Sequence, residues 1–108
     1  MVTAEFNNIC ISGIAAAVPT QCVDAREYEH LFGQDVVRKN IITTGVRQAY
    51  HASENQTSSD LAYIAAKKLL KEMNVDPKSI DVLIFTAAYL DYQVPPTSCV
   101  LQYRLGLS

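Results

Sequence analysis

The residue in this sequence best placed to be a nucleophile is a cysteine in the first turn of a predicted helix. Cys99 follows the run Pro95-Pro96-Thr97-Ser98, which begins a helix predicted to end near Leu105. Free amides and the positive helix end favour a thiolate at such a position. A buried parallel strand is predicted just before it, and α/β proteins place their sites beyond such strands.

A cysteine nucleophile needs a base, and His30 and His51 are the two histidines of the chain. Nothing in the sequence brings either one close to Cys99. The alternative is that Cys99 is a small thiol packed between a helix and a sheet. His30 lies in a charged run and His51 ends a weak strand, so both are predicted to face solvent. Two isolated histidines without paired carboxylates predict no metal site.

Weaker signals come from a turn and a loop. Arg47 follows Thr43-Thr44-Gly45-Val46, where a glycine beside an arginine could hold an anion, but the motif is short. Asp91 and Tyr92 fall in the loop after the buried strand, where substrate contacts are expected, although an ordinary polar loop is the alternative. There is neither a GxGxxG motif nor a P-loop.

Composition narrows the class of protein. The chain has 108 residues, 9 Lys plus Arg, 11 Asp plus Glu and a net charge of −2, which fits one small domain and disfavours a nucleic-acid partner. A hydrophobic fraction of 49% argues against disorder. No apolar run approaches the roughly 20 residues of a membrane helix, and residues 1–5 do not resemble a signal peptide. Three widely spaced cysteines predict no disulfide framework or zinc ribbon, which favours a reducing cytoplasm.

The first half of the chain predicts short elements. Alternating β-branched residues predict a strand over 6–13, and Asp24 with Glu27 forms a capping-box-like helix start that Gly33 ends. Asp35 is expected to cap a second helix over 36–41. A turn at 43–45 and a weak strand over 46–52 follow.

The second half gives the clearest signals. A helix is predicted over 57–73, begun by Thr57 or Ser58 and followed by Asn74 and Pro77. The apolar run within 80–88 predicts a strand covered on both faces. Thr97 is expected to cap a last helix over 98–105. The order β-α-α-(β)-α-β-α predicts an α/β layered domain.

Several of these strings in register resemble one family. They are Ile11-Ser12-Gly13-Ile14, Thr44-Gly45-Val46-Arg47, Ser59-Asp60-Leu61-Ala62 with Asp76-Pro77, Ile80-Asp81-Val82-Leu83-Ile84, and Pro95-Pro96-Thr97-Ser98-Cys99. In order and spacing they resemble the opening segment of 3-oxoacyl-(acyl-carrier-protein) synthase III, an initiating condensing enzyme of the thiolase-like fold. The resemblance covers essentially the whole chain. It implies that residues 1–108 form a single, truncated N-terminal thiolase-like domain.

The resemblance also implies a reaction. Members of the family are longer homodimers in which a cysteine takes an acyl group from an acyl-CoA or acyl-carrier donor. A His and an Asn then promote decarboxylation of malonyl-acyl carrier protein and carbon–carbon bond formation. In the family these three residues lie beyond the position matching residue 108, so no catalytic residue, metal or cofactor is expected within the chain. Cys99 matches a non-catalytic cysteine of the family.

Substrate contacts are implied at Thr44, Arg47 and Val94. The family's adenine-stacking Trp and phosphate-binding Arg match Lys39 and Thr43, which puts acetyl-CoA as the primer in doubt. Val94 replaces a bulky aromatic that lines the partner subunit's acyl pocket, which implies a roomier pocket. The pathway could be fatty-acid, capsule, polyketide or related lipid synthesis.

The expected function is therefore the N-terminal part of a condensing enzyme, inactive by itself and cytoplasmic, with no nucleic-acid or membrane partner. The uncovered strand of residues 82–88 is expected to drive self-association. The alternative is a free-standing small α/β binding domain without catalysis.

Overall fold

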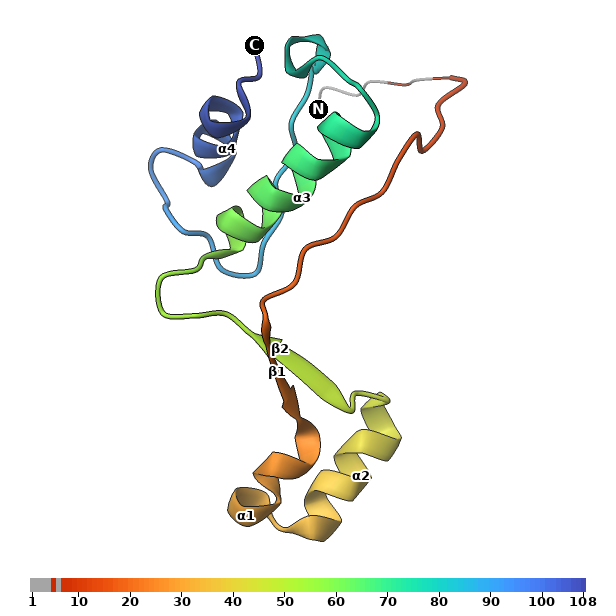
Figure 1. The fold of residues 1–108 in the computed structure, drawn as a ribbon, viewed down its shortest axis with the longest axis vertical. Helices are drawn as coiled ribbons and strands as arrows, with labels where there is room; N and C mark the ends of the chain where they lie inside the picture. The colour runs from red at the N-terminus through yellow and green to blue at the C-terminus, as the bar shows by residue number, and fades with distance from the viewer. Residues whose placement is uncertain (1–4, 6) are drawn as a thin grey trace.

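A computed structural model describes Glu5 and residues 7–108, in which two helical groups are joined by a pair of antiparallel strands (Figure 1). One group holds the 3-10 helix η1 (Ala25–Tyr28), α1 (Glu29–Phe32) and α2 (Gln34–Thr44). The other holds α3 (Ser58–Glu72), the 3-10 helix η2 (Pro77–Ser79) and α4 (Thr97–Leu105). Within the described residues, no helix is long and apolar enough to cross a membrane.

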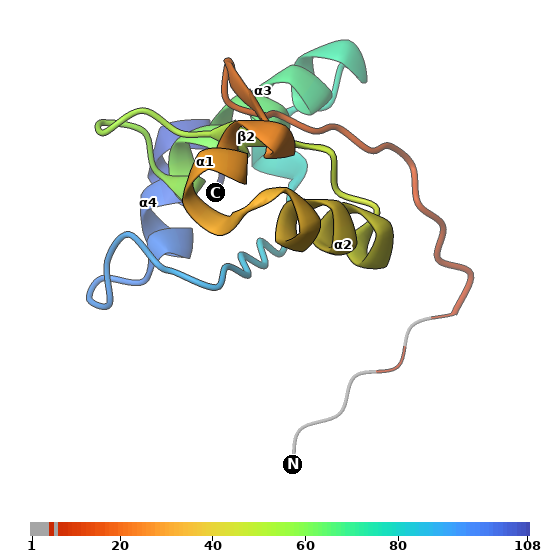
Figure 2. The ribbon, with the colours of Figure 1, turned by 90° about the horizontal axis from the view of Figure 1, so that it is seen from below.

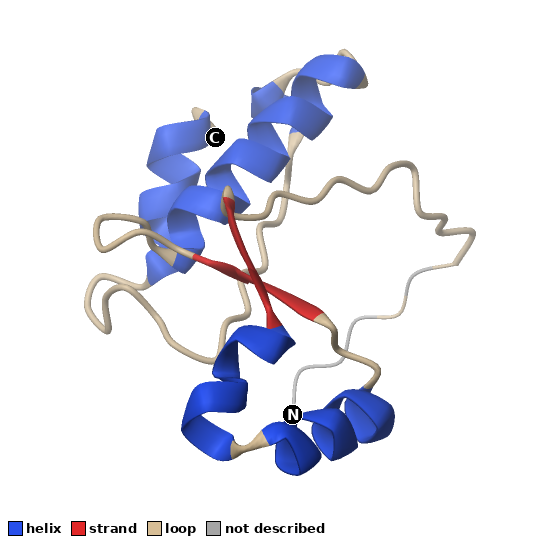
Figure 3. Cartoon of the chain, turned by 60° about the horizontal axis from the view of Figure 1, so that its bottom comes forward, coloured by secondary structure: helices blue, strands red, loops and turns tan. Residues whose placement is uncertain are grey.

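The strands are β1 (Gln21–Asp24) and β2 (Gln48–His51), which pair antiparallel with Gln21 opposite His51, and η1, α1 and α2 lie between them in the chain. Figure 3 shows the two strands crossing between the helical groups. The strand predicted over 46–52 is confirmed in β2, whereas β1 was not predicted. Its four residues lack the alternation that marks a strand, and pairing with β2 stabilises them.

Local capping explains where the helices begin and end. The Asp24 carboxylate accepts the Arg26 N–H at 2.9 Å and the Glu27 carboxylate accepts the Asp24 N–H at 3.1 Å, which confirms the predicted capping box. Gly45, at φ 73°, ends α2 in the left-handed conformation that glycine adopts without strain. The predicted start of α3 is confirmed, because the Thr57 N–H donates to Asp60 at 3.0 Å.

Two predicted caps are wrong. The second helix begins at Gln34 with Gly33 at its N-cap, so Asp35 lies inside α2 and does not cap it. The last helix includes Thr97 and has Pro96 at its N-cap. The Thr97 hydroxyl instead donates to the Tyr92 carbonyl at 3.4 Å. Both helices therefore start one or two residues earlier than their polar side chains suggested.

The predicted strands over 6–13 and 80–88 are also wrong, because no strand occurs in either range among the described residues. Phe6, the first residue of the earlier strand, lies outside them. Residues 7–13 and 80–88 run as irregular chain, the former along one side of the molecule (Figure 2). Residues 80–88 alternate, with Leu83 and Phe85 half-buried and Val82 and Ile84 73% and 83% exposed. The segment is therefore covered on one face and not on both.

Burial is sparse in this chain. Among the described residues the buried hydrophobic side chains are Val37 of α2 and Leu101 of α4. The radius of gyration is 18.4 Å, against about 13 Å for a compact domain of this length. The helices pack in pairs, α1 with α2 and α3 with α4, and much apolar surface remains uncovered.

Candidate functional site

Arg47, the predicted anion contact, follows the end of α2 and lines a pocket of about 480 Å³ beside η1 and α2. Its main-chain carbonyl accepts the Ala25 N–H at 2.8 Å, which ties the residue to the first turn of η1. The pocket is lined by three arginines, three carboxylates and three other residues: Arg26, Arg38, Arg47, Asp24, Glu29, Asp35, Gln34, Ile41 and Ile42.

The arginines of this pocket, which we call the Arg47 pocket, are available to a ligand. Among the described residues, none of Arg26, Arg38 and Arg47 has a carboxylate within ion-pair distance. The Asp24 carboxylate already accepts the Arg26 N–H in the helix cap. Guanidinium groups bind phosphate and carboxylate groups through paired N–H donors, so the pocket could hold an anion.

Sequence reasoning missed Arg26 and Arg38, since they lie in helical segments where a charged side chain is ordinarily solvated. Only the packing of η1 against α2 brings them to the same pocket as Arg47. The signal that could have found Arg38 is its spacing of three from Ile41 on α2.

Thr44 and Val94 do not line the Arg47 pocket. The Thr44 hydroxyl donates to the Asn40 carbonyl at 2.8 Å and accepts the Val46 N–H at 3.2 Å, so it closes the end of α2. Val94 lies in the loop before α4 and is 88% exposed. Of the three predicted substrate contacts, the structure therefore brings Arg47 together with other charged groups and leaves Thr44 and Val94 outside that pocket.

Cys99 lies in α4 and its N–H donates to the Pro96 carbonyl at 2.9 Å. The thiol is exposed, and the small pocket beside it is lined without a histidine. The His30 ring nitrogen Nδ1 donates to the Glu27 carbonyl at 2.6 Å, and His51 Nε2 lies 3.3 Å from the Tyr28 hydroxyl of η1. The described residues thus place no imidazole against the Cys99 thiol.

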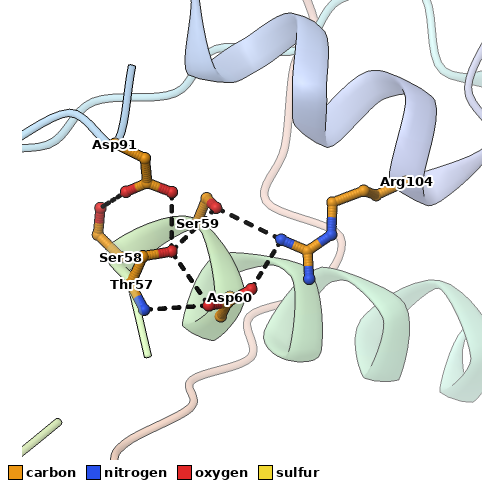
Figure 4. A network of polar contacts seen from close by, with 6 residues as sticks. All are labelled: Thr57, Ser58, Ser59, Asp60, Asp91 and Arg104. Atoms are coloured by element: carbon orange, nitrogen blue, oxygen red, sulfur yellow. Dashed lines mark hydrogen bonds and ion pairs between the residues drawn. The ribbon is translucent and has the colours of Figure 1, made fainter. Parts of the chain in front are cut away.

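Asp91, a predicted loop contact, is occupied in a network at the start of α3 (Figure 4). Its carboxylate accepts the Thr57 hydroxyl at 2.8 Å and the Ser58 hydroxyl at 3.0 Å. The nearby Ser59 hydroxyl, and then those of Thr57 and Ser58, lower the pKa of Asp91 despite its partial burial. The network fixes the loop before α4 on the first turn of α3.

Arg104 joins α4 to the same turn. Its Nη1 lies 2.8 Å from Asp60 Oδ1 and donates to the Ser59 hydroxyl at 3.4 Å (Figure 4). Its guanidinium carbon lies 4.5 Å from the centre of the Tyr63 ring. The Thr57 N–H and then Arg104 lower the pKa of Asp60. The network is therefore a structural clamp between α3, α4 and the loop, with no free nucleophile.

Comparisons with known proteins show which proteins this chain resembles. The chain is 31% identical over 100 residues to the beta-ketoacyl-[acyl-carrier-protein] synthase III of Helicobacter hepaticus, covering 90% of the chain and 29% of that protein. The Staphylococcus haemolyticus protein of the same name is 34% identical over 100 residues, covering 91% of the chain and 31% of that protein. A crystal structure of a 3-oxoacyl-(acyl-carrier protein) synthase from Burkholderia xenovorans superposes with a TM-score of 0.80 at 33% identity, covering 88% of the chain and 28% of that protein.

The chain is a partial homologue of beta-ketoacyl-[acyl-carrier-protein] synthase III. It spans less than a third of the length of the relatives it matches. No family model matches it. The fold expected from the sequence, a partial thiolase-like α/β arrangement, is confirmed, with fewer strands than predicted.

Proposed function

We propose that this chain forms part of a condensing enzyme that joins an acyl primer to malonyl-acyl carrier protein with decarboxylation. The homology to synthase III proteins supports the reaction class. The observation that carries the proposal is the Arg47 pocket, where three arginines face one space without ion-pair partners in the described part of the chain.

The Arg47 pocket suits the anionic end of an acyl donor. Coenzyme A and the phosphopantetheine arm of a carrier both bring phosphate groups, which guanidinium groups bind in pairs. The three carboxylates of the pocket bring its formal charge to zero, which weakens binding of a simple anion. A donor with hydrogen-bonding groups around its phosphates can use both signs of charge.

Val94 serves a different part of the proposed site. Its side chain is exposed in a loop whose start Asp91 anchors on α3. We place Val94 against the acyl chain bound by a partner subunit of a homodimer, where a side chain smaller than an aromatic leaves room for a longer primer. Thr44 takes an indirect part, since its hydroxyl closes the turn that leads to Arg47.

Binding of coenzyme A to the chain, measured by isothermal titration, tests the Arg47 pocket. Arg47→Gln and Arg38→Gln are each expected to weaken binding about tenfold, the effect of losing one charge-assisted hydrogen bond. Lys78→Gln removes a positive charge outside the pocket and is expected to change binding little. Equal affinities for Arg47→Gln and the unchanged chain would refute the assignment.

Turnover is a separate test. We expect the 108 residues to show neither decarboxylation of malonyl-acyl carrier protein nor condensation, and Cys99→Ala to make no difference. Release of carbon dioxide from labelled malonyl-carrier measures both. Turnover that disappears in Cys99→Ala would show that this thiol is a nucleophile after all.

A further inference from the structure

A second pocket, of about 350 Å³, is lined by residues of α3, α4 and the turn after α3. These two helices belong to the helical group on the other side of β1 and β2 from α1 and α2 (Figure 1). The pocket is lined by an aromatic, three cationic residues and five other residues: Tyr63, Lys67, Lys71, Arg104, Leu70, Asn74, Val75, Pro77 and Leu105. We call it the α3–α4 pocket.

The charge of the α3–α4 pocket is one-sided. Three lysine and arginine side chains line it and no carboxylate does, although the whole chain carries a net charge of −2. The Arg47 pocket, by contrast, has equal numbers of each sign. A local excess of positive charge raises the concentration of anions at a surface and speeds their association.

Tyr63 holds two of the cations in place. Arg104 lies over the ring at 4.5 Å and Lys67 Nζ lies 5.4 Å from the ring centre. Arg104 is also fixed through Nη1 by its ion pair with Asp60. Placing these side chains before a ligand arrives lowers the entropy cost of binding.

Lys67 and Lys71 have no ion-pair partner among the described residues, whereas their neighbour Lys68 lies 3.9 Å from Glu72. Lys68 does not line the α3–α4 pocket. Lys67 therefore lines the pocket without an ion-pair partner in the described part of the chain, while the adjacent Lys68 is paired and lies outside it.

Apart from Asn74, the rest of the lining is apolar. Leu70, Val75, Pro77 and Leu105 are half-buried and line the pocket together with the charged side chains. A pocket of this size, apolar with a few placed polar groups, is typical of small-molecule sites. The ligand class that matches both features is an anion with an apolar body.

The ends of α3 and α4 lie beside the pocket, and helix C-termini carry partial negative charge. That charge is reduced here, because the Val75 N–H caps the Leu70 carbonyl at 2.9 Å and the Leu107 N–H caps the Gln102 carbonyl at 3.1 Å. Favourable interaction with the negative helix ends explains why cations occur in the last turns, at Lys71 and Arg104. It does not explain Lys67, which lies further back in α3.

We propose that the α3–α4 pocket binds a small organic anion, an aryl or acyl phosphate or carboxylate, whose charged group meets Lys67, Lys71 and Arg104. Its apolar part contacts the half-buried side chains. This site is separate from the proposed donor site and does not depend on the condensing reaction.

Titration of the ¹⁵N-labelled chain with phenyl phosphate tests the proposal by NMR. Phenyl phosphate is expected to shift the amides of Val75 and Leu105 in a saturable way, and to bind at least about tenfold more tightly than inorganic phosphate or benzyl alcohol. Equal affinity for phenyl phosphate and inorganic phosphate would refute the apolar contact.

Matched variants test the charges. The double variant Lys67→Gln, Lys71→Gln is expected to weaken phenyl phosphate binding at least about tenfold. Lys68→Gln removes one positive charge outside the pocket and is expected to keep the original affinity. Lys67→Arg should retain binding, which shows that charge and not fold is the cause. The proposal fails if Lys68→Gln weakens binding as much as the double variant, or if the double variant binds as the unchanged chain does.

Discussion

The uncovered face of residues 82–88 predicts that the chain associates with itself. Val82 and Ile84 are 73% and 83% exposed on one side of an extended segment that forms no strand pairing among the described residues. Unpaired extended backbone with apolar side chains is a template for pairing with another chain. We therefore expect a dimer or larger oligomer whose contact includes this face.

The variant Ile84→Lys tests the contact and allows its size to be worked out. Burying an isoleucine that is almost fully exposed contributes about 2 kcal/mol. A two-fold dimer buries the residue twice, so the variant loses about 4 kcal/mol, or roughly a thousandfold in the dissociation constant. Sedimentation equilibrium over a range of concentrations measures this constant directly.

Leu31→Lys supplies the matched control, because Leu31 is 63% exposed but lies in α1, away from the extended segment. Its dissociation constant should stay within a few-fold of the unchanged chain's. A monomeric chain at high concentration would refute the reasoning. So would an Ile84→Lys variant that associates as tightly as Leu31→Lys.

Three further predictions concern stability, each measured by urea unfolding followed by circular dichroism. Leu101→Ala should lose about 2–4 kcal/mol, because Leu101 is 2% exposed in the helix that packs on α3. The lowered pKa of Asp91 means that its carboxylate stabilises the folded chain above about pH 4 and that this contribution disappears as the pH falls further, so Asp91→Asn should reduce the loss of stability below pH 4. Gly13→Ala should lower the free energy of unfolding by about 1 kcal/mol, because a Cβ there would meet the Met73 sulphur and lie 3.0 Å from Leu69 Cδ1. In a chain that carries Met73→Ala, the same substitution should cost less, because the sulphur is gone.

Helix boundaries were predictable where the capping groups lie close in sequence. The Asp24–Glu27 box and the Thr57–Asp60 contact each span three residues, so the sequence contains both partners. Asp35 misled because an aspartate within the first turn of α2 also favours the helix start without capping it. The signal was real, but it defined the start only to within a turn.

The extended segments show which information a sequence holds about a strand. The continuous apolar run within 80–88 predicted a strand covered on both faces, which is wrong, since Leu83 and Phe85 are half-buried and Val82 and Ile84 are exposed. It could not say whether a neighbouring strand covers the second face. Pairing partners are far away in sequence, as β1 and β2 are, so their presence cannot be judged from the segment alone.

The same division between local and distant contacts separates the predicted site residues. Arg47 was predicted as an anion contact because it follows a recognisable turn, while Arg26 and Arg38 reach the same pocket through the packing of η1 on α2. Asp91 was found as a polar loop residue, yet its partners lie 33 and 34 residues earlier in α3. Those partners decide its role, because a carboxylate that already accepts two hydroxyl hydrogen bonds has less capacity left for a substrate. A motif thus indicates which residues could do chemistry, and the contacts made by the fold decide which of them remain free to do it.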